Sequence, residues 1–195
     1  MVLAGVVGVV LLVGCGPSNP TPTGTVQPTS SQAGSGAPVL TQPELDSGKF
    51  MGNPCGLLTT GQIAQVASGV VGKVWPESIL GPSCQWNANA EPAKIYFSVT
   101  INTKSGGLAG IYELRSGARV FEPTQVGAYP AVVTMPEDLR DGGQCVLETA
   151  VAKAVTIRVD MTLRGGVNKP ADYATPCPRA VKISELVLET LKGGG

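Results

Sequence analysis

Two stretches of this chain alternate between apolar and polar residues with a period of two. Residues 95–101 place Ile, Phe and Val between Tyr, Ser and Thr, and residues 154–163 repeat the pattern. Successive side chains of a strand point to opposite faces, so both stretches predict strands with one buried and one solvated face. Residues 145–151 are separated from the second stretch by a short turn, so the two segments are predicted to form a β-hairpin. Shorter extended segments are predicted at residues 84–87, 118–122 and 126–135.

Three other segments have the period of amphipathic helices. Thr59 and Gln62 have the spacing of a capping box, and the apolar residues after them predict a helix over residues 60–71. A short helix is predicted after Gly106.

The last helix is expected to take Thr175 as its cap and Pro176 as its first residue. This order of elements predicts an α+β fold, with a mostly antiparallel sheet, helices packed on one side and two disulfides.

The chain opens with an apolar run that ends at Cys15, and a tract rich in Pro, Thr, Ser and Gly follows. This order is typical of a bacterial lipoprotein signal, in which the cysteine carries the lipid. The run is shorter than the roughly 20 residues of a spanning helix. We therefore expect a signal peptide over residues 1–14, lipidation of Cys15 and an anchor on the extracytoplasmic face of the cell membrane. No basic residue precedes the run, so the natural start is expected upstream of Met1.

Residues 15–48 contain few large apolar side chains and cannot bury enough surface to offset their chain entropy. We expect this segment to be a disordered spacer behind the lipidated cysteine. Residues 49–195 then form a single domain of ordinary size.

Charge and residue usage exclude several classes of function. The 195 residues include 14 basic and 14 acidic ones, and no basic cluster is interleaved with aromatic residues, so nucleic-acid binding is not expected. The chain has no histidine, which removes Ser-His-Asp and Cys-His catalysis and every histidine-ligated metal site. No cofactor is expected.

Four cysteines follow Cys15, and their spacing points to disulfides. None of them stands in a C-x-x-C arrangement, so a metal site is not expected. An even number of cysteines in an exported domain predicts two disulfides. Of the three possible pairings we favour Cys55–Cys84 and Cys145–Cys177, each of which closes a loop of about thirty residues.

A few residues are candidates for chemistry or recognition. Glu137, Asp138 and Asp141 form an acidic cluster that is either a catalytic carboxylate pair or a solvated loop. Trp86 either lines a sugar or lipid pocket or packs on the neighbouring disulfide in the core. Tyr129-Pro130 is either a recognition edge or a strand bulge. One further set lies on the solvated faces of the two alternating strands and forms a single surface if those strands are neighbours: Tyr96, Ser98, Thr100, Arg158 and Asp160.

Several short motifs, most of them around the cysteines, give the domain a family resemblance. In order along the chain stand Asn53-Pro54-Cys55-Gly56-Leu57-Leu58-Thr59, Cys84-Gln85-Trp86, Gly127-Ala128-Tyr129-Pro130-Ala131, a strand beginning at Cys145, and Pro176-Cys177. This pattern resembles the actinobacterial lipoproteins of domain of unknown function family 3558 over residues 53–191. The resemblance implies an exported, membrane-anchored protein of an actinobacterium, and it assigns no activity.

Three hypotheses for function follow. The favoured one is a binding or interaction module of the cell envelope, whose partner is an envelope protein, a glycan or a lipid. The alternative is a lipid or small-ligand carrier with an apolar cavity. The third, a carboxylate-based envelope hydrolase, requires two acids that converge in one cleft.

Overall fold

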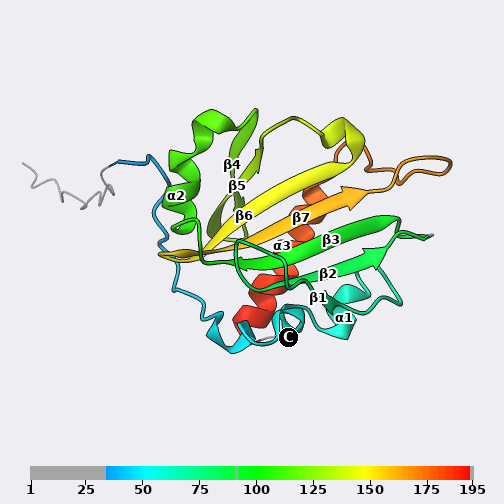
Figure 1. Cartoon of the computed structure of the whole chain (residues 1–195), viewed down its shortest axis with the longest axis horizontal. Helices are drawn as coiled ribbons and strands as arrows, with labels where there is room; N and C mark the ends of the chain where they lie inside the picture. The colour runs from blue at the N-terminus through cyan, green and yellow to red at the C-terminus, as the bar shows by residue number, and fades with distance from the viewer. Residues whose placement is uncertain (1–33, 91, 194–195) are drawn as a thin grey trace, which may run out of the picture.

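The computed structural model describes residues 34–90 and 92–193. Seven strands form one antiparallel sheet in the order β1-β2-β3-β7-β6-β5-β4 (Figure 1). The strands are β1 Lys73–Val74, β2 Ser83–Ala88, β3 Ile95–Asn102, β4 Val120–Val126, β5 Tyr129–Met135, β6 Gln144–Ala152 and β7 Val155–Leu163. The expected α+β class, with its antiparallel sheet and two disulfides, is confirmed.

The three α-helices, α1 Thr60–Ile63, α2 Gly107–Glu113 and α3 Cys177–Leu191, lie on two faces of the sheet. Thr149 of β6 forms a 2.9 Å hydrogen bond with Ser184 of α3, whereas the next residue, Ala150, packs against α2. Neighbouring strand residues point to opposite faces, so α2 lies on the face away from α3. We call the α3 side the back face and the other side, turned to the viewer in Figure 1, the front face. The expected placement of helices on one side therefore fails for α2.

The main core fills the space between the back face and α3. The apolar residues of the two alternating strands, from Ile95 to Ile101 and from Ile157 to Leu163, are fully or almost fully buried there. Gln62 ties α1 to α3, because its Nε2 donates to the carbonyl of Leu186 and its Oε1 accepts from Thr190, both at 2.9 Å. The period-two pattern thus predicted the buried side of the sheet correctly.

The first helix is much shorter than predicted, although its capping box is present at Thr59. The helix ends at Ile63, the backbone turns at Gly69 with a φ of +77°, and Val71 is 88% exposed. Gly72 lies so close to the disulfide that an added Cβ would sit 2.7 Å from Cys84 Sγ. The chain must therefore leave the helix early to enter β1, which the sequence pattern did not predict. The last helix also differs by one residue, since Pro176 rather than Thr175 occupies its cap position and makes no side-chain cap bond.

Residues 34–47 pack along the end of the domain, and we call them the strap. We expected them to belong to the disordered spacer. Leu40 and Leu45 pack against the main core, and Ala37 packs against the smaller cluster under α2. Four hydrogen bonds join the strap to parts of the domain that are distant in sequence: Arg115 Nη1 to the Ser35 carbonyl (2.9 Å), Tyr129 OH to the Pro43 carbonyl (3.0 Å), the Leu45 amide to the Val151 carbonyl (2.8 Å) and the Lys153 amide to Glu44 Oε1 (2.8 Å). A few apolar residues and carbonyl groups are enough to order a segment of polar composition.

The described residues contain no helix that is both long and apolar enough to cross a membrane.

Candidate binding face

The polar residues of the two alternating strands are neighbours, as the single-surface hypothesis required. β3 pairs with β7 so that Ser98 lies opposite Asp160 and Thr100 lies opposite Arg158. Tyr96, Arg158 and Asp160 reach the surface of the front face. Ser98 and Thr100 are only 3% exposed, so the expectation that this whole set is solvated is wrong for these two residues.

A buried carboxylate, which sequence reasoning missed, lies beside this set. Glu148 of β6 has no exposed surface, and its Oε1 accepts from Arg158 Nη1 at 3.0 Å. Thr156 Oγ1 donates to Glu148 Oε2, and Asn102 Nδ2 lies 3.3 and 3.4 Å from the two carboxylate oxygens. A buried charge is tolerated when it is paired and hydrogen-bonded in this way.

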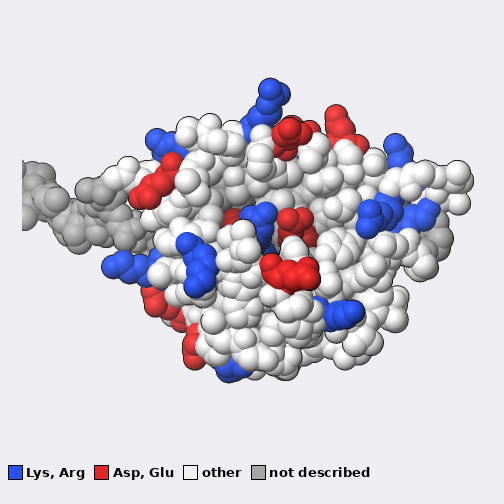
Figure 2. Space-filling model, viewed as in Figure 1, with Lys and Arg blue, Asp and Glu red and all other residues white. Residues whose placement is uncertain are grey.

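The same arrangement fixes the surface groups above it. Arg158 donates from its other terminal nitrogen to Asp160 Oδ2 at 3.3 Å, so the guanidinium is held between a buried acid and an exposed one. Figure 2 shows adjoining basic and acidic side chains at the centre of the front face, surrounded by a mostly uncharged surface. Glu148, Arg158 and Asp160 together carry a formal charge of −1.

One signal in the sequence could have found Glu148. It is the one acid in a mostly apolar strand, and the register of β6 with β7 places it directly opposite Arg158. An acid and a base that face each other across a hairpin form a cross-strand pair.

A hollow of about 480 Å³ lies beside this ion-pair group, at the β1 edge of the front face. We call it the front-face groove, and its lining residues are Gly69, Val70, Val71, Lys73, Gln85, Asn87 and Tyr96. The sheet register connects the groove to the ion pairs, because Gln85, Ser98 and Asp160 lie side by side on three successive strands.

Tyr96 is the polar residue common to the predicted set and the groove. Its hydroxyl donates to Gln85 Oε1 at 2.6 Å, which leaves the Gln85 amide nitrogen directed away from the tyrosine. Burial raises the pKa of Tyr96, the nearby Asp160 carboxylate raises it further, and Arg164 opposes them. The phenol therefore stays neutral at physiological pH and serves as a hydrogen-bonding group.

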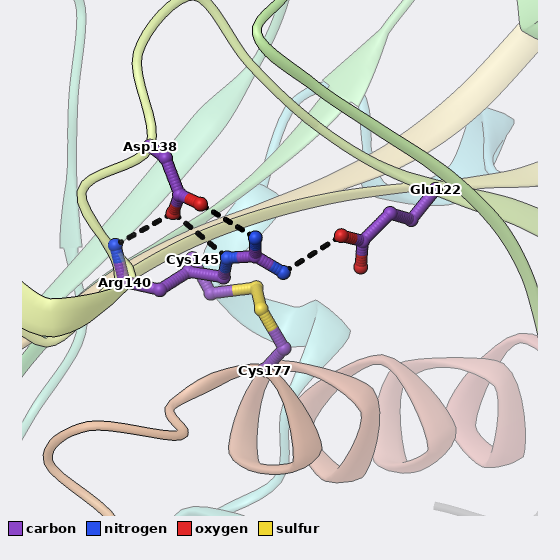
Figure 3. Close-up of a disulfide and its surroundings, with 5 residues drawn as sticks. All are labelled: Glu122, Asp138, Arg140, Cys145 and Cys177. Atoms are coloured by element: carbon purple, nitrogen blue, oxygen red, sulfur yellow. Dashed lines mark hydrogen bonds and ion pairs between the residues drawn. A yellow bond between two sulfur atoms is a disulfide. The ribbon is translucent and has the colours of Figure 1, made fainter.

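The acidic loop contains an ion-pair cluster rather than a carboxylate pair. Arg140 donates to both oxygens of Asp138, at 2.8 and 2.6 Å, and to Glu122 at 2.8 Å (Figure 3). The hydrogen bonds from Arg140 lower the pKa of Asp138 to about 2. Asp141 lines a small hollow beside these residues, and Glu137 takes no part in the hydrogen bonds of the cluster. No group of three or more acidic or cysteine side chains among the described residues could hold a metal ion.

Both predicted disulfides are present, Cys55–Cys84 and Cys145–Cys177. The first joins the turn before α1 to β2, and the second joins β6 to the first residue of α3. Figure 3 shows the second bridge directly beside the Arg140 cluster.

Two candidate recognition residues, Trp86 and Tyr129, are buried. Trp86 is fully buried and stacks on Phe97 with ring centroids 4.9 Å apart, so it is a core residue and lines no pocket. Tyr129 is 4% exposed, and its hydroxyl donates to the Pro43 carbonyl of the strap. Pro130 precedes the point where β5 begins to pair with β6, so its missing N–H breaks no ladder bond.

Surface hollows of the described residues, the front-face groove among them, have volumes of about 290 to 570 Å³. These hollows are open, and each has at least one charged residue in its lining. Cys15 and the expected signal peptide lie outside the described residues.

A family model described as "Protein of unknown function (DUF3558)" matches residues 10–190. The chain therefore belongs to this family. No curated protein and no solved structure matches it.

Proposed function

We propose that this family member is a binding module of the cell envelope, held by a lipid on Cys15 at the extracytoplasmic face of the membrane. The apolar run before Cys15 and the two disulfides support an exported location. The front face of the sheet, from the front-face groove to Arg158 and Asp160, is its binding surface.

The single observation that carries this proposal is the fully buried Glu148 carboxylate, which pairs with Arg158, a side chain that reaches the surface of the front face beside Asp160. Such a pair contributes little net stability, since the desolvation penalty of two charges offsets much of their attraction. Its effect is to hold Arg158 and Asp160 in one geometry at the surface. Groups fixed before a partner arrives lose less conformational entropy on binding, which raises affinity.

The same contacts favour a binding face over a carboxylate-based hydrolase. Glu148 has no exposed surface, so it cannot touch a substrate unless the groups around it move. Asp160 is held by Arg158. An acid–base pair needs two carboxyl groups that both reach the reacting bond.

The lipid anchor is tested with a Cys15→Ser variant of the full chain, expressed in an actinobacterial host with an alkyne-labelled fatty acid. The wild-type protein should carry the label and fractionate with membranes, and the variant should do neither. Membrane fractionation and labelling of the variant would refute lipidation at Cys15.

The binding face is tested with a photo-crosslinking amino acid in the full-length protein in its own envelope. Asn87 in the front-face groove is replaced in one variant, and Gln65, an exposed amide on the back-face side, is replaced in the matched control. We expect a discrete adduct from position 87 and none from position 65. Equal adduct patterns, or none from position 87, would reject the front face as the binding surface.

A further inference from the structure

We infer that the front face binds an extended neutral glycan, seated across the strands from Lys73 to the Arg158–Asp160 pair. This inference rests on the proposed function and names the ligand class of the same surface.

The exposed polar groups of the front face form two adjacent rows across the sheet. In one row Lys73, Gln85, Ser98 and Asp160 lie opposite one another on β1, β2, β3 and β7. In the next row the register aligns residues from β2 to β6: Asn87, Tyr96, Thr162 and Gln144. All of these except Ser98 have exposed surface.

The length of these rows favours an oligomer over a single sugar. Neighbouring strands lie about 4.8 Å apart, so the four spacings from β1 to β6 cover roughly 19 Å. No helix crosses this part of the sheet, because the contacts of α2 lie over Val132 and Ala150. The helix α2 therefore does not obstruct a ligand that lies along the rows.

Charge along the rows disfavours a strongly ionic ligand. An anionic chain that meets Lys73 at one end would meet the Asp160 carboxylate at the other. A cationic chain would be repelled by Lys73 at one end and by the Arg158 guanidinium at the other. A neutral ligand is not repelled at either end.

The hydrogen-bonding groups of the rows match hydroxyl groups. The amides of Gln85, Asn87 and Gln144 and the Thr162 hydroxyl each have donor and acceptor capacity, and Tyr96, whose hydroxyl donates to Gln85, can still accept. Sugar hydroxyl groups also donate and accept. Val70 and Val71 provide an apolar wall on one side of the groove, against which the C–H face of a sugar ring can pack.

The test uses the full chain, purified in detergent, on an array of neutral and acidic oligosaccharides of two to six sugar residues. The free form of any bound sugar is then titrated by calorimetry. We expect binding to neutral oligosaccharides that strengthens from two to four sugar residues. Asn87→Ala and Tyr96→Phe should each weaken it about 2- to 10-fold, the range for one lost hydrogen bond. Gln65→Ala, in a separate hollow that Arg179 and Lys182 of α3 also line, should leave the affinity unchanged.

Each other result overturns the inference. Binding to acidic sugars alone would show that Lys73 or Arg158 dominates recognition. Affinity insensitive to both groove variants would place the sugar elsewhere. An array without binding, together with a protein adduct from crosslinking at position 87, would reject the glycan and keep the front face as a protein-binding surface. If the crosslinking also fails, the proposed function falls with the glycan.

Discussion

Glu148→Gln is the perturbation that probes the front face most directly. The substitution preserves side-chain volume but removes the charge and replaces one acceptor oxygen with a donor nitrogen. Three groups, Asn102, Thr156 and Arg158, now donate to that carboxylate in a fully buried position. After the change Arg158 loses its charged acceptor, and Thr156 must turn its hydroxyl to accept from the new amide nitrogen if that nitrogen replaces Oε2.

The magnitude follows from the burial of the pair. Removal of one partner of a buried ion pair typically destabilises a protein by about 3–5 kcal/mol. The Arg158 side chain is 26% exposed and keeps Asp160, so we expect the lower end, about 3 kcal/mol. In a domain of this size that loss lowers the melting temperature by roughly 6–12 °C.

The assay is urea unfolding of the oxidised protein, followed by the fluorescence of the buried Trp86. Glu122→Gln is the matched control, because Glu122 also pairs with an arginine but is 57% exposed. A surface pair of this kind contributes about 0–1 kcal/mol, so the control should unfold close to wild type. A Glu148→Gln protein whose free energy of unfolding lies within 1 kcal/mol of the wild-type value, with an unchanged denaturant slope, would refute the proposal that Glu148 fixes Arg158 and Asp160 in one geometry.

Three further predictions concern the rest of the domain. Reduction of both disulfides, which join residues 29 and 32 positions apart, should remove about 3–4 kcal/mol each in the chain-entropy model; an unchanged melting temperature with all four thiols titrated as free would contradict this. Gly72→Ala should destabilise by about 1–3 kcal/mol through contact with Cys84 Sγ, whereas Gly61→Ala, with nothing within 4 Å, should be neutral or slightly stabilising in thermal melts. Asp138 should titrate at a pKa of about 2 by carboxyl NMR and move towards its ordinary value of about 3.9 in Arg140→Gln. Because this pKa is lowered in the folded state, the ion pair stabilises above about pH 4 and is lost as the pH falls towards 2.

Sequence patterns predicted the buried side of the sheet well, because the alternation along each strand decides which of its side chains face the core. Alternation from Ile95 to Ile101 fixed which side chains face the core, whereas the pairing of β3 with β7 and its register came only from the structure. Of the three possible cysteine pairings, the favoured one is present, and each of its bridges joins elements close together in the sequence.

The failures come from contacts between distant parts of the chain. The apolar spacing that predicted a helix to Val71 is overridden by Gly72, whose backbone must approach the disulfide and Trp86. The strap is ordered by carbonyl groups that meet Arg115, Tyr129 and Val151, and composition cannot reveal such partners. The role of Glu148 requires Asn102, which lies 46 positions earlier in the chain.

The two faces of the sheet contribute differently to the fold, and this explains how the part of the front face around Tyr96, Arg158 and Asp160 can stay exposed. Both disulfides, the stacked Trp86 and Phe97, and α3 all lie on the back face, where they cross-link and bury the sheet. An antiparallel sheet stabilised in this way can leave its other face in water. On the front face the folding role falls to the apolar cluster under α2, to Glu148 and to the buried hydroxyl groups beside it. Asn87, by contrast, has no part in the core, so a variant there tests binding separately from folding, and surface changes of this kind could alter the ligand without loss of the fold.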